Sequence, residues 1–226
     1  MKKTIILLIF IVILLTTGYY SKQRYYEPKQ RIKNARNEVK WLINNNKIKD
    51  ADLIFQTSLS KQSIAIQKAS KSIYSHCGLI FKDSNDFYVY EAVQPVKRTP
   101  LDKWIAKGKD GHYVIKRLKD SNHILNDEIT LKIKKNCQQF MGKNYDITFE
   151  WSDEKIYCSE LIWKAYQRAC GIEIGQLQKL KAFDLTDETV KAKMKERYGN
   201  NIPMNEIVIS PAAIFESKLL IIVKSN

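Results

Sequence analysis

The chain has 226 residues and a formal net charge of +14 at pH 7, a length that suits one domain with a full core after a short leader. Such positive charge favours anionic partners, namely phospholipid headgroups, acidic cell-wall polymers or nucleic acid, although it is spread along the chain rather than gathered in one block. The four cysteines include no CxxC pair and exclude a disulfide-dense scaffold. We expect at least one of them to stay reduced.

The N-terminus has the layout of an export signal. Lys2 and Lys3 precede an apolar run of eleven residues, 5–15, which is followed by the small and polar residues 16–18. This run is shorter than the roughly 18 apolar residues of a spanning helix, which favours cleavage. Tyr19–Tyr20 could act as an interfacial anchor, which keeps an uncleaved membrane anchor as the alternative. We therefore expect residues 1–20 to direct export to the periplasm or cell envelope.

A polar linker at 21–30 leads into one domain at 31–226. Helical periodicity and short apolar runs between turns predict its elements in chain order. The predicted helices cover 32–44, 62–72, 101–107, 129–142, 158–170 and a short segment starting at 211. The predicted strands cover 52–55, 75–81, 87–92, 112–118, 207–209 and 219–223. Residues 82–86 predict a hairpin turn, and Pro95 and Pro100 bracket a predicted loop. Since helices and hairpin-type strands mix without a regular βαβ repeat, the fold class is α+β.

Two segments could carry chemistry. Cys158 begins a predicted helix, where unpaired backbone N–H groups and the helix dipole stabilise a thiolate. His76 lies on a strand, and a histidine beside the thiol would lower the thiol pKa further and protonate a leaving group. Spacing alone leaves structural readings open, because a cysteine at a helix start is most often a small core residue. Cys77 should point to the opposite sheet face from His76, so we interpret it as packing, as we do Cys137 and Cys170.

The chain resembles the YiiX/YebB-like group of permuted NlpC/P60 papain-like cysteine hydrolases over roughly residues 50–223. The resemblance is carried by four segments in this order: Asp52-Leu53-Ile54-Phe55, Ser75-His76-Cys77-Gly78-Leu79, Glu91-Ala92-Val93 and Tyr157-Cys158-Ser159-Glu160-Leu161. In ordinary papain-like chains the cysteine precedes the histidine, whereas in the permuted group the histidine strand comes first, as here. The resemblance implies a circularly permuted papain-like fold with a mainly antiparallel sheet packed against helices.

The resemblance also implies the roles of the site residues. Cys158 would be the nucleophile and His76 its base, with Glu91 orienting the imidazole. The Cys158 backbone N–H would meet the oxyanion, and Tyr157 is a candidate for helping it. No cofactor is implied, and the sequence shows no His/Cys/Asp/Glu cluster with metal-ligand spacing.

Three functions follow from these observations. The first is a thiol hydrolase or acyltransferase acting on an amide or ester bond of a cell-envelope peptide or lipid at the membrane surface, with an amide preferred. The second is a binding module for a lipid, peptide or amino acid on the same fold with little or no catalysis. A nucleic-acid binder rests on charge alone and is disfavoured by the export signal. A deep apolar groove would indicate an acyl chain and a shallow polar groove a peptide. The sequence leaves the oligomeric state open.

Overall fold

The computed structural model describes residues 12–13, 16 and 27–226. Apart from positions 12, 13 and 16, the predicted signal or anchor at 1–20 lies outside the described residues. None of the helices within the described ranges is long and apolar enough to cross a membrane. The helices are α2 (Glu27–Asn44), α3 (Ser63–Ser70), α4 (Leu101–Lys107), α5 (Ser121–Ile124), α6 (Asp127–Gln139), α7 (Cys158–Cys170), α8 (Glu188–Tyr198) and α9 (Pro211–Phe215), with 3-10 turns η2 (Lys109–Gly111) and η3 (Leu180–Ala182). The strands are β1 (Asp52–Gln56), β2 (His76–Asp83), β3 (Asp86–Glu91), β4 (Lys97–Pro100), β5 (Val114–Leu118), β6 (Gln178–Lys179), β7 (Ile207–Val208) and β8 (Leu220–Ser225).

A six-stranded sheet in the order β4-β3-β2-β1-β5-β8 forms the centre of the domain. Each pair of neighbouring strands in it is antiparallel, and β2 and β3 form the predicted hairpin. In the register of β1 and β2, His76 pairs with Gln56 at the end of β1. The histidine therefore lies at the end of the sheet where the inner strand β2 begins. The short strands β6 and β7 pair with each other in a separate ribbon.

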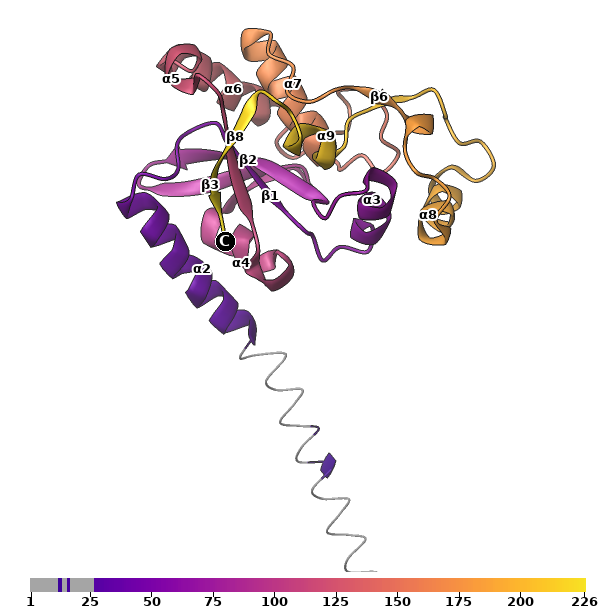
Figure 1. Cartoon of the computed structure of the whole chain (residues 1–226), viewed down its shortest axis with the longest axis horizontal. Helices are drawn as coiled ribbons and strands as arrows, with labels where there is room; N and C mark the ends of the chain where they lie inside the picture. The colour runs from indigo at the N-terminus through magenta and orange to yellow at the C-terminus, as the bar shows by residue number, and fades with distance from the viewer. Residues whose placement is uncertain (1–11, 14–15, 17–26) are drawn as a thin grey trace, which may run out of the picture.

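Helices cover both faces of this sheet, and Figure 1 shows α2 and α4 on one side and α6 and α7 on the other. Alternation along the strands explains the two cores. Phe55 and Leu79 pack in the cluster that contains residues of α6 and α7, whereas Ile54 and Ile80 pack with residues of α2 and α4. Burial of each such side chain stabilises the fold by about 1.5–3 kcal/mol. The α+β class and the antiparallel sheet are as predicted.

Three local predictions need correction. Helix α2 begins at Glu27, inside the segment predicted as a linker. The loop predicted between Pro95 and Pro100 contains β4, which is an edge strand and therefore tolerates a terminal proline without an N–H. Helix α8 was not predicted, because it buries just Val190 and Met194 and shows no broad apolar stripe.

Candidate active site

The imidazole of His76 is held by a buried carboxylate. His76 begins β2 and Glu91 ends β3, and the distance between His76 Nε2 and Glu91 Oε2 is 2.6 Å. The same carboxylate accepts hydrogen bonds from Trp104 Nε1 at 2.9 Å and from Thr99 Oγ1 at 2.6 Å. The Trp104 ring stacks on the imidazole with centroids 5.8 Å apart. These contacts fix both the plane and the tautomer of the ring.

Gly78 makes this approach of β2 and β3 possible. A Cβ atom at this position would lie 2.4 Å from Val89 Cγ1 and 2.9 Å from the Tyr90 carbonyl oxygen, and 3.5 Å from Glu91 Cβ. The first two distances are too short for any real side chain. The glycine two residues after His76 therefore lets β3 pass close enough to place Glu91 beside the histidine.

Cys158 is the first residue of α7 and is 2% exposed. Its position places the sulfur in the field of the helix N-terminus. The first turn is closed by Glu160, whose Oε2 accepts from the Tyr157 backbone N–H at 3.4 Å and whose Oε1 pairs with Lys164 at 2.7 Å. The predicted helix stop is also present, since Gly171 caps the C-terminus in the left-handed region.

Cys158 and His76 carry opposite charges at neutral pH. Hydrogen bonding from Cys77 and from His76, together with the His76 charge, outweighs burial and holds the pKa of Cys158 well below its ordinary value. Burial alone would lower the pKa of His76, but hydrogen bonds and charge from Cys158 and Glu91 raise that pKa to about 10. Burial opposes ionisation of Glu91 as well, yet His76 and Thr99 keep its pKa below the usual value. The site therefore holds a thiolate, an imidazolium and a carboxylate.

Cys77 does more than the packing role we predicted. Its side chain lies in the buried core on the α7 face of the sheet, as strand alternation requires. This face also brings it near Cys158, and the interaction with Cys77 lowers the pKa of Cys158. Burial and the interaction with Cys158 raise the pKa of Cys77 well above its ordinary value, so Cys77 stays protonated beside Cys158. All four cysteines are free, in agreement with our expectation that at least one stays reduced.

The Tyr157 hydroxyl binds the protein backbone, whereas we predicted that it helps to stabilise an oxyanion. Its hydroxyl is buried and accepts a hydrogen bond from the Ile209 backbone N–H at 3.0 Å. The neighbouring Ser159 donates its Oγ–H to the Ile209 carbonyl at 2.7 Å. Both backbone polar groups of Ile209 are thus bound by the start of α7, which attaches the chain after β7 to the helix that begins at Cys158. The Tyr157 hydroxyl serves this attachment as an acceptor, and its part in an oxyanion site stays a prediction.

Tyr145 is the tyrosine that sequence reasoning missed. It lines the same pocket as Cys158, and its hydroxyl accepts from Gln62 Nε2 at 3.0 Å. Gln62 Oε1 in turn accepts from Arg197 Nη2 at 2.6 Å. Burial and the nearby Cys158 charge raise the pKa of Tyr145, while Gln62 and Arg197 oppose this rise. Because Gln62 donates to the Tyr145 oxygen, the Tyr145 O–H stays available as a donor.

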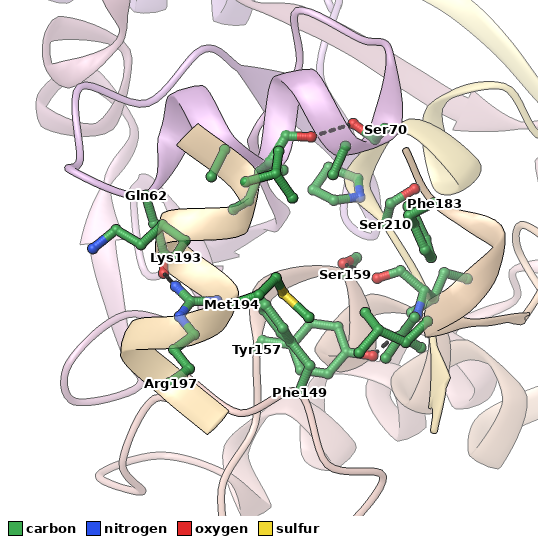
Figure 2. Close-up of a pocket in the computed structure, with 18 of the residues that line it drawn as sticks. Gln62, Ser70, Phe149, Tyr157, Ser159, Phe183, Lys193, Met194, Arg197 and Ser210 are labelled. Carbon is green, nitrogen blue, oxygen red and sulfur yellow. Dashed lines mark hydrogen bonds between the residues drawn. The ribbon is translucent and has the colours of Figure 1, made fainter. Parts of the chain in front are cut away.

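A pocket adjoins Cys158, which is one of the residues that line it. Its walls come from α3, the start of α7, the loop around η3, α8 and the segment after β7. Figure 2 shows Met194, Phe149 and Tyr157 facing its centre, whereas Lys193 and Arg197 extend away from it on α8. Cys158 is therefore buried against protein on the β2 side and borders a largely apolar pocket on the other side.

A thiolate at a helix start, facing a strand histidine and its carboxylate on an antiparallel sheet, is the arrangement of a papain-like cysteine hydrolase with permuted chain order. Residues 47–223 match the family model described as permuted papain-like amidase enzyme, YaeF/YiiX, C92 family, and the chain belongs to this family. It is 48% identical to the uncharacterized protein YiiX of Escherichia coli K12 over 169 residues, which are 75% of this chain and 82% of that protein. It is similar to the crystal structure of YiiX from Escherichia coli O157:H7, with a TM-score of 0.76 and 47% identity over 80% of this chain and 98% of that one.

That solved structure is titled as a metalloprotein. In the described part of this chain, no group of three or more histidine, cysteine, aspartate or glutamate side chains is placed to hold a metal ion. The charged groups of the site also already pair with one another. The described residues of the site therefore do not fit a metal centre.

Proposed function

We propose that this protein is an exported thiol hydrolase that cleaves an amide bond in a peptide or lipid of the cell envelope, with Cys158, His76 and Glu91 as its catalytic machinery. The observation that carries the proposal is the placement of His76 at 2.6 Å from Glu91 and beside Cys158, since the imidazole and the thiol each move the other's pKa toward the charged form. Membership of an amidase family supports an amide over an ester.

The reaction runs in two stages. The Cys158 thiolate attacks the carbonyl carbon, and the oxyanion accepts hydrogen bonds from the Cys158 backbone N–H and the Tyr145 hydroxyl. His76 gives its proton to the leaving nitrogen, the C–N bond breaks and an acyl-thioester forms. Neutral His76 then takes a proton from water, whose oxygen attacks the thioester. The acid leaves, and the proton that His76 has taken restores the thiolate–imidazolium pair.

Alkylation with iodoacetamide near neutral pH tests the nucleophile. We expect Cys158 to be modified selectively and faster than Cys170, which is a half-buried thiol in the same helix and serves as an internal reference. His76→Ala should abolish that selectivity, and Cys158→Ala should abolish amide turnover. Equal and slow labelling of all four cysteines would instead support a binding module on this fold.

The export part of the proposal rests on the sequence of residues 1–20. Their charged start and eleven-residue apolar run are typical of a segment that crosses or enters a membrane. Cell fractionation combined with N-terminal sequencing of the mature chain tests it. Recovery of the full chain in the cytosolic fraction would refute export, whereas an intact N-terminus in the membrane fraction would identify an uncleaved anchor.

A further inference from the structure

The outer face of α2 carries a stripe of cations. Four exposed cations recur along the helix at spacings of four, three and four residues: Lys29, Lys33, Arg36 and Lys40. Positions at this spacing lie on one face of a helix. The opposite face packs inward, since Ala35 and Leu42 are buried in the cluster that also contains residues of α4. The stripe therefore faces solvent, away from the sheet.

A groove between α2 and α4 adds further cations on this side of the domain. The two helices pack against each other. Three cations line the groove together with apolar side chains: Arg31, Lys103 and Lys107 with Ile32 and Ala106. Among the described residues that line it, Glu27 is the one carboxylate. A phosphate group in this groove would thus meet more positive than negative charge.

Most of these cations are not neutralised within the protein. Six of them form no ion pair with another described residue, and we call these six the basic face: Lys29, Arg31, Lys33, Lys40, Lys103 and Lys107. Arg36, by contrast, pairs with Asp102 at 3.5 Å. Glu38 is engaged by the Tyr113 hydroxyl and by Lys224. Charge that is spread along the sequence is therefore brought together here by the packing of α2 on α4.

The C-terminal end of α2 exposes two large apolar side chains. Trp41 is 42% exposed and Ile43 is 37% exposed. Ile43 follows Lys40 by three residues and thus lies on the same stripe as the cations. A helix that presents lysines and arginines next to an exposed tryptophan and aliphatic side chains is typical of binding at a bilayer interface. A soluble polyanion would offer these apolar side chains no matching contact, so the combination favours a lipid surface.

We propose that the basic face docks on an anionic phospholipid surface, with headgroup phosphates bound by α2 and α4. This inference goes beyond the hydrolase function and does not rest on it. Because α2 begins at Glu27, after the predicted leader at 1–20, the chain keeps the basic face whether or not the leader is cleaved. Docking holds α2 and α4 against the bilayer, on the side of the sheet opposite α6 and α7 (Figure 1).

Acetylation of lysine amines, read by mass spectrometry, measures docking of the full chain independently of how the chain is anchored. The protein is reconstituted in nanodiscs of phosphatidylcholine with or without phosphatidylglycerol. We expect the anionic lipid to slow acetylation of Lys33, Lys40 and Lys103, and high salt to restore the rates, because salt screens exposed charges. The exposed Lys135 on α6 is the internal reference, and its rate should be the same in both kinds of nanodisc.

Removal of charge tests whether this face is the one that docks. Lys33→Gln combined with Lys40→Gln should lower the docking constant, read from the protection of Lys103, by about 25-fold, since each cation near an anionic surface contributes about fivefold. Lys132→Gln combined with Lys135→Gln on α6 is the matched control, because it removes the same charge from the other side of the sheet. The control should leave the protection of Lys103 unchanged. Alkylation of Cys158 checks that both double variants are folded.

Three results would overturn the proposal. The first is equal acetylation of Lys33, Lys40 and Lys103 with and without phosphatidylglycerol. The second is an equal loss of Lys103 protection in both double variants, which would mean that net charge acts rather than this face. The third is protection by soluble polyphosphate but not by the anionic nanodiscs, which would identify a polymer as the ligand. Since none of these results depends on turnover at Cys158, the hydrolase function is tested separately.

Discussion

Replacement of Glu91 by glutamine isolates the charge of the carboxylate from its shape. The glutamine oxygen can accept from His76 and Trp104 as Oε2 does now, while its NH₂ group can donate to Thr99, whose hydroxyl also accepts. Packing is thus preserved, and the fold should lose little stability. What disappears is the negative charge beside the imidazolium.

The expected change in the pKa of His76 follows from the hydrogen bond to residue 91, whose acceptor loses its negative charge in Glu91→Gln. A hydrogen bond between charged partners contributes about 1.5–3 kcal/mol, and one pKa unit corresponds to about 1.4 kcal/mol. The pKa of His76, which is about 10 in the native protein, should therefore fall by about one to two units. Catalysis needs protonated His76, so activity is present below this pKa and is lost as the pH rises through it. The alkaline limb should move from near pH 10 to about pH 8–9.

The pH dependence of kcat/KM for an acyl anilide measures this shift, and the pH dependence of Cys158 alkylation checks it independently. Glu91→Ala is the contrasting variant, because it also leaves Trp104 Nε1 without its acceptor. It should destabilise the fold by about 1–3 kcal/mol in addition to shifting the limb. If the alkaline limb of Glu91→Gln stays where it is in the native protein, the carboxylate does not set the charge of His76 and our reasoning about the site is wrong.

Three further variants test individual contacts. Cys77→Ala should raise the pKa of Cys158 and slow its alkylation at neutral pH, whereas Cys77→Ser keeps a hydrogen-bond donor and should retain most of the reactivity. If the rate of Cys158 alkylation has the same pH dependence in Cys77→Ala and in the native protein, the Cys77 thiol is not a donor to Cys158. Tyr145→Phe should lower kcat for the anilide by about 100-fold with little change in KM, and an unchanged kcat would remove Tyr145 from the oxyanion site. Gly78→Ala should lower the free energy of unfolding in urea by about 1–3 kcal/mol, because its Cβ meets Val89; no loss would show that β3 can move aside.

The sequence predicts the site well where local patterns and chain order carry the information. The apolar periodicity after Cys158 and the stop at Gly171 define α7, and the turn at 82–86 defines the β2–β3 hairpin. With the resemblance, these segments name His76, Glu91 and Cys158. How the three side chains meet depends on long-range packing of α7 against β2, which no local pattern encodes.

The missed parts of the site have weak local signals. Helix α8 shows two inward apolar side chains, Val190 and Met194, one turn apart, on an otherwise charged segment. Tyr145 lies in a loop, and its hydrogen-bond partner Gln62 is 83 residues away in the sequence. Strand alternation placed Cys77 correctly on the face opposite His76, but it could not show that Cys158 lies where both can reach it. Tertiary contacts thus determine how α8 and Tyr145 come to line the pocket beside Cys158, and how Cys77 comes to lie near that residue.

The thiolate–imidazolium pair also predicts how stability depends on pH. In the unfolded chain His76 has an ordinary pKa near 6.5 and Cys158 one near 9.0. The folded-state pKa of His76 is raised, so its contribution is full below 6.5 and is lost as the pH rises to about 10. The folded-state pKa of Cys158 is lowered, so its contribution is full above 9.0 and is lost as the pH falls. Between 6.5 and 9.0 the two slopes cancel, because folding moves one proton from sulfur to nitrogen without net uptake.

Urea unfolding across the pH range can detect this plateau. The difference in unfolding free energy between the native protein and the double variant Cys158→Ser, His76→Gln, which lacks both titrating groups, should be flat between about pH 6.5 and 9. It should decrease by about 1.4 kcal/mol per pH unit above that window, where the folded state alone retains the His76 proton. It should also decrease below the window, where the unfolded chain alone gains a proton on His76. A difference that rises or falls steadily through the neutral range would mean that one partner is ionised without the other, and the paired thiolate and imidazolium would have to be abandoned.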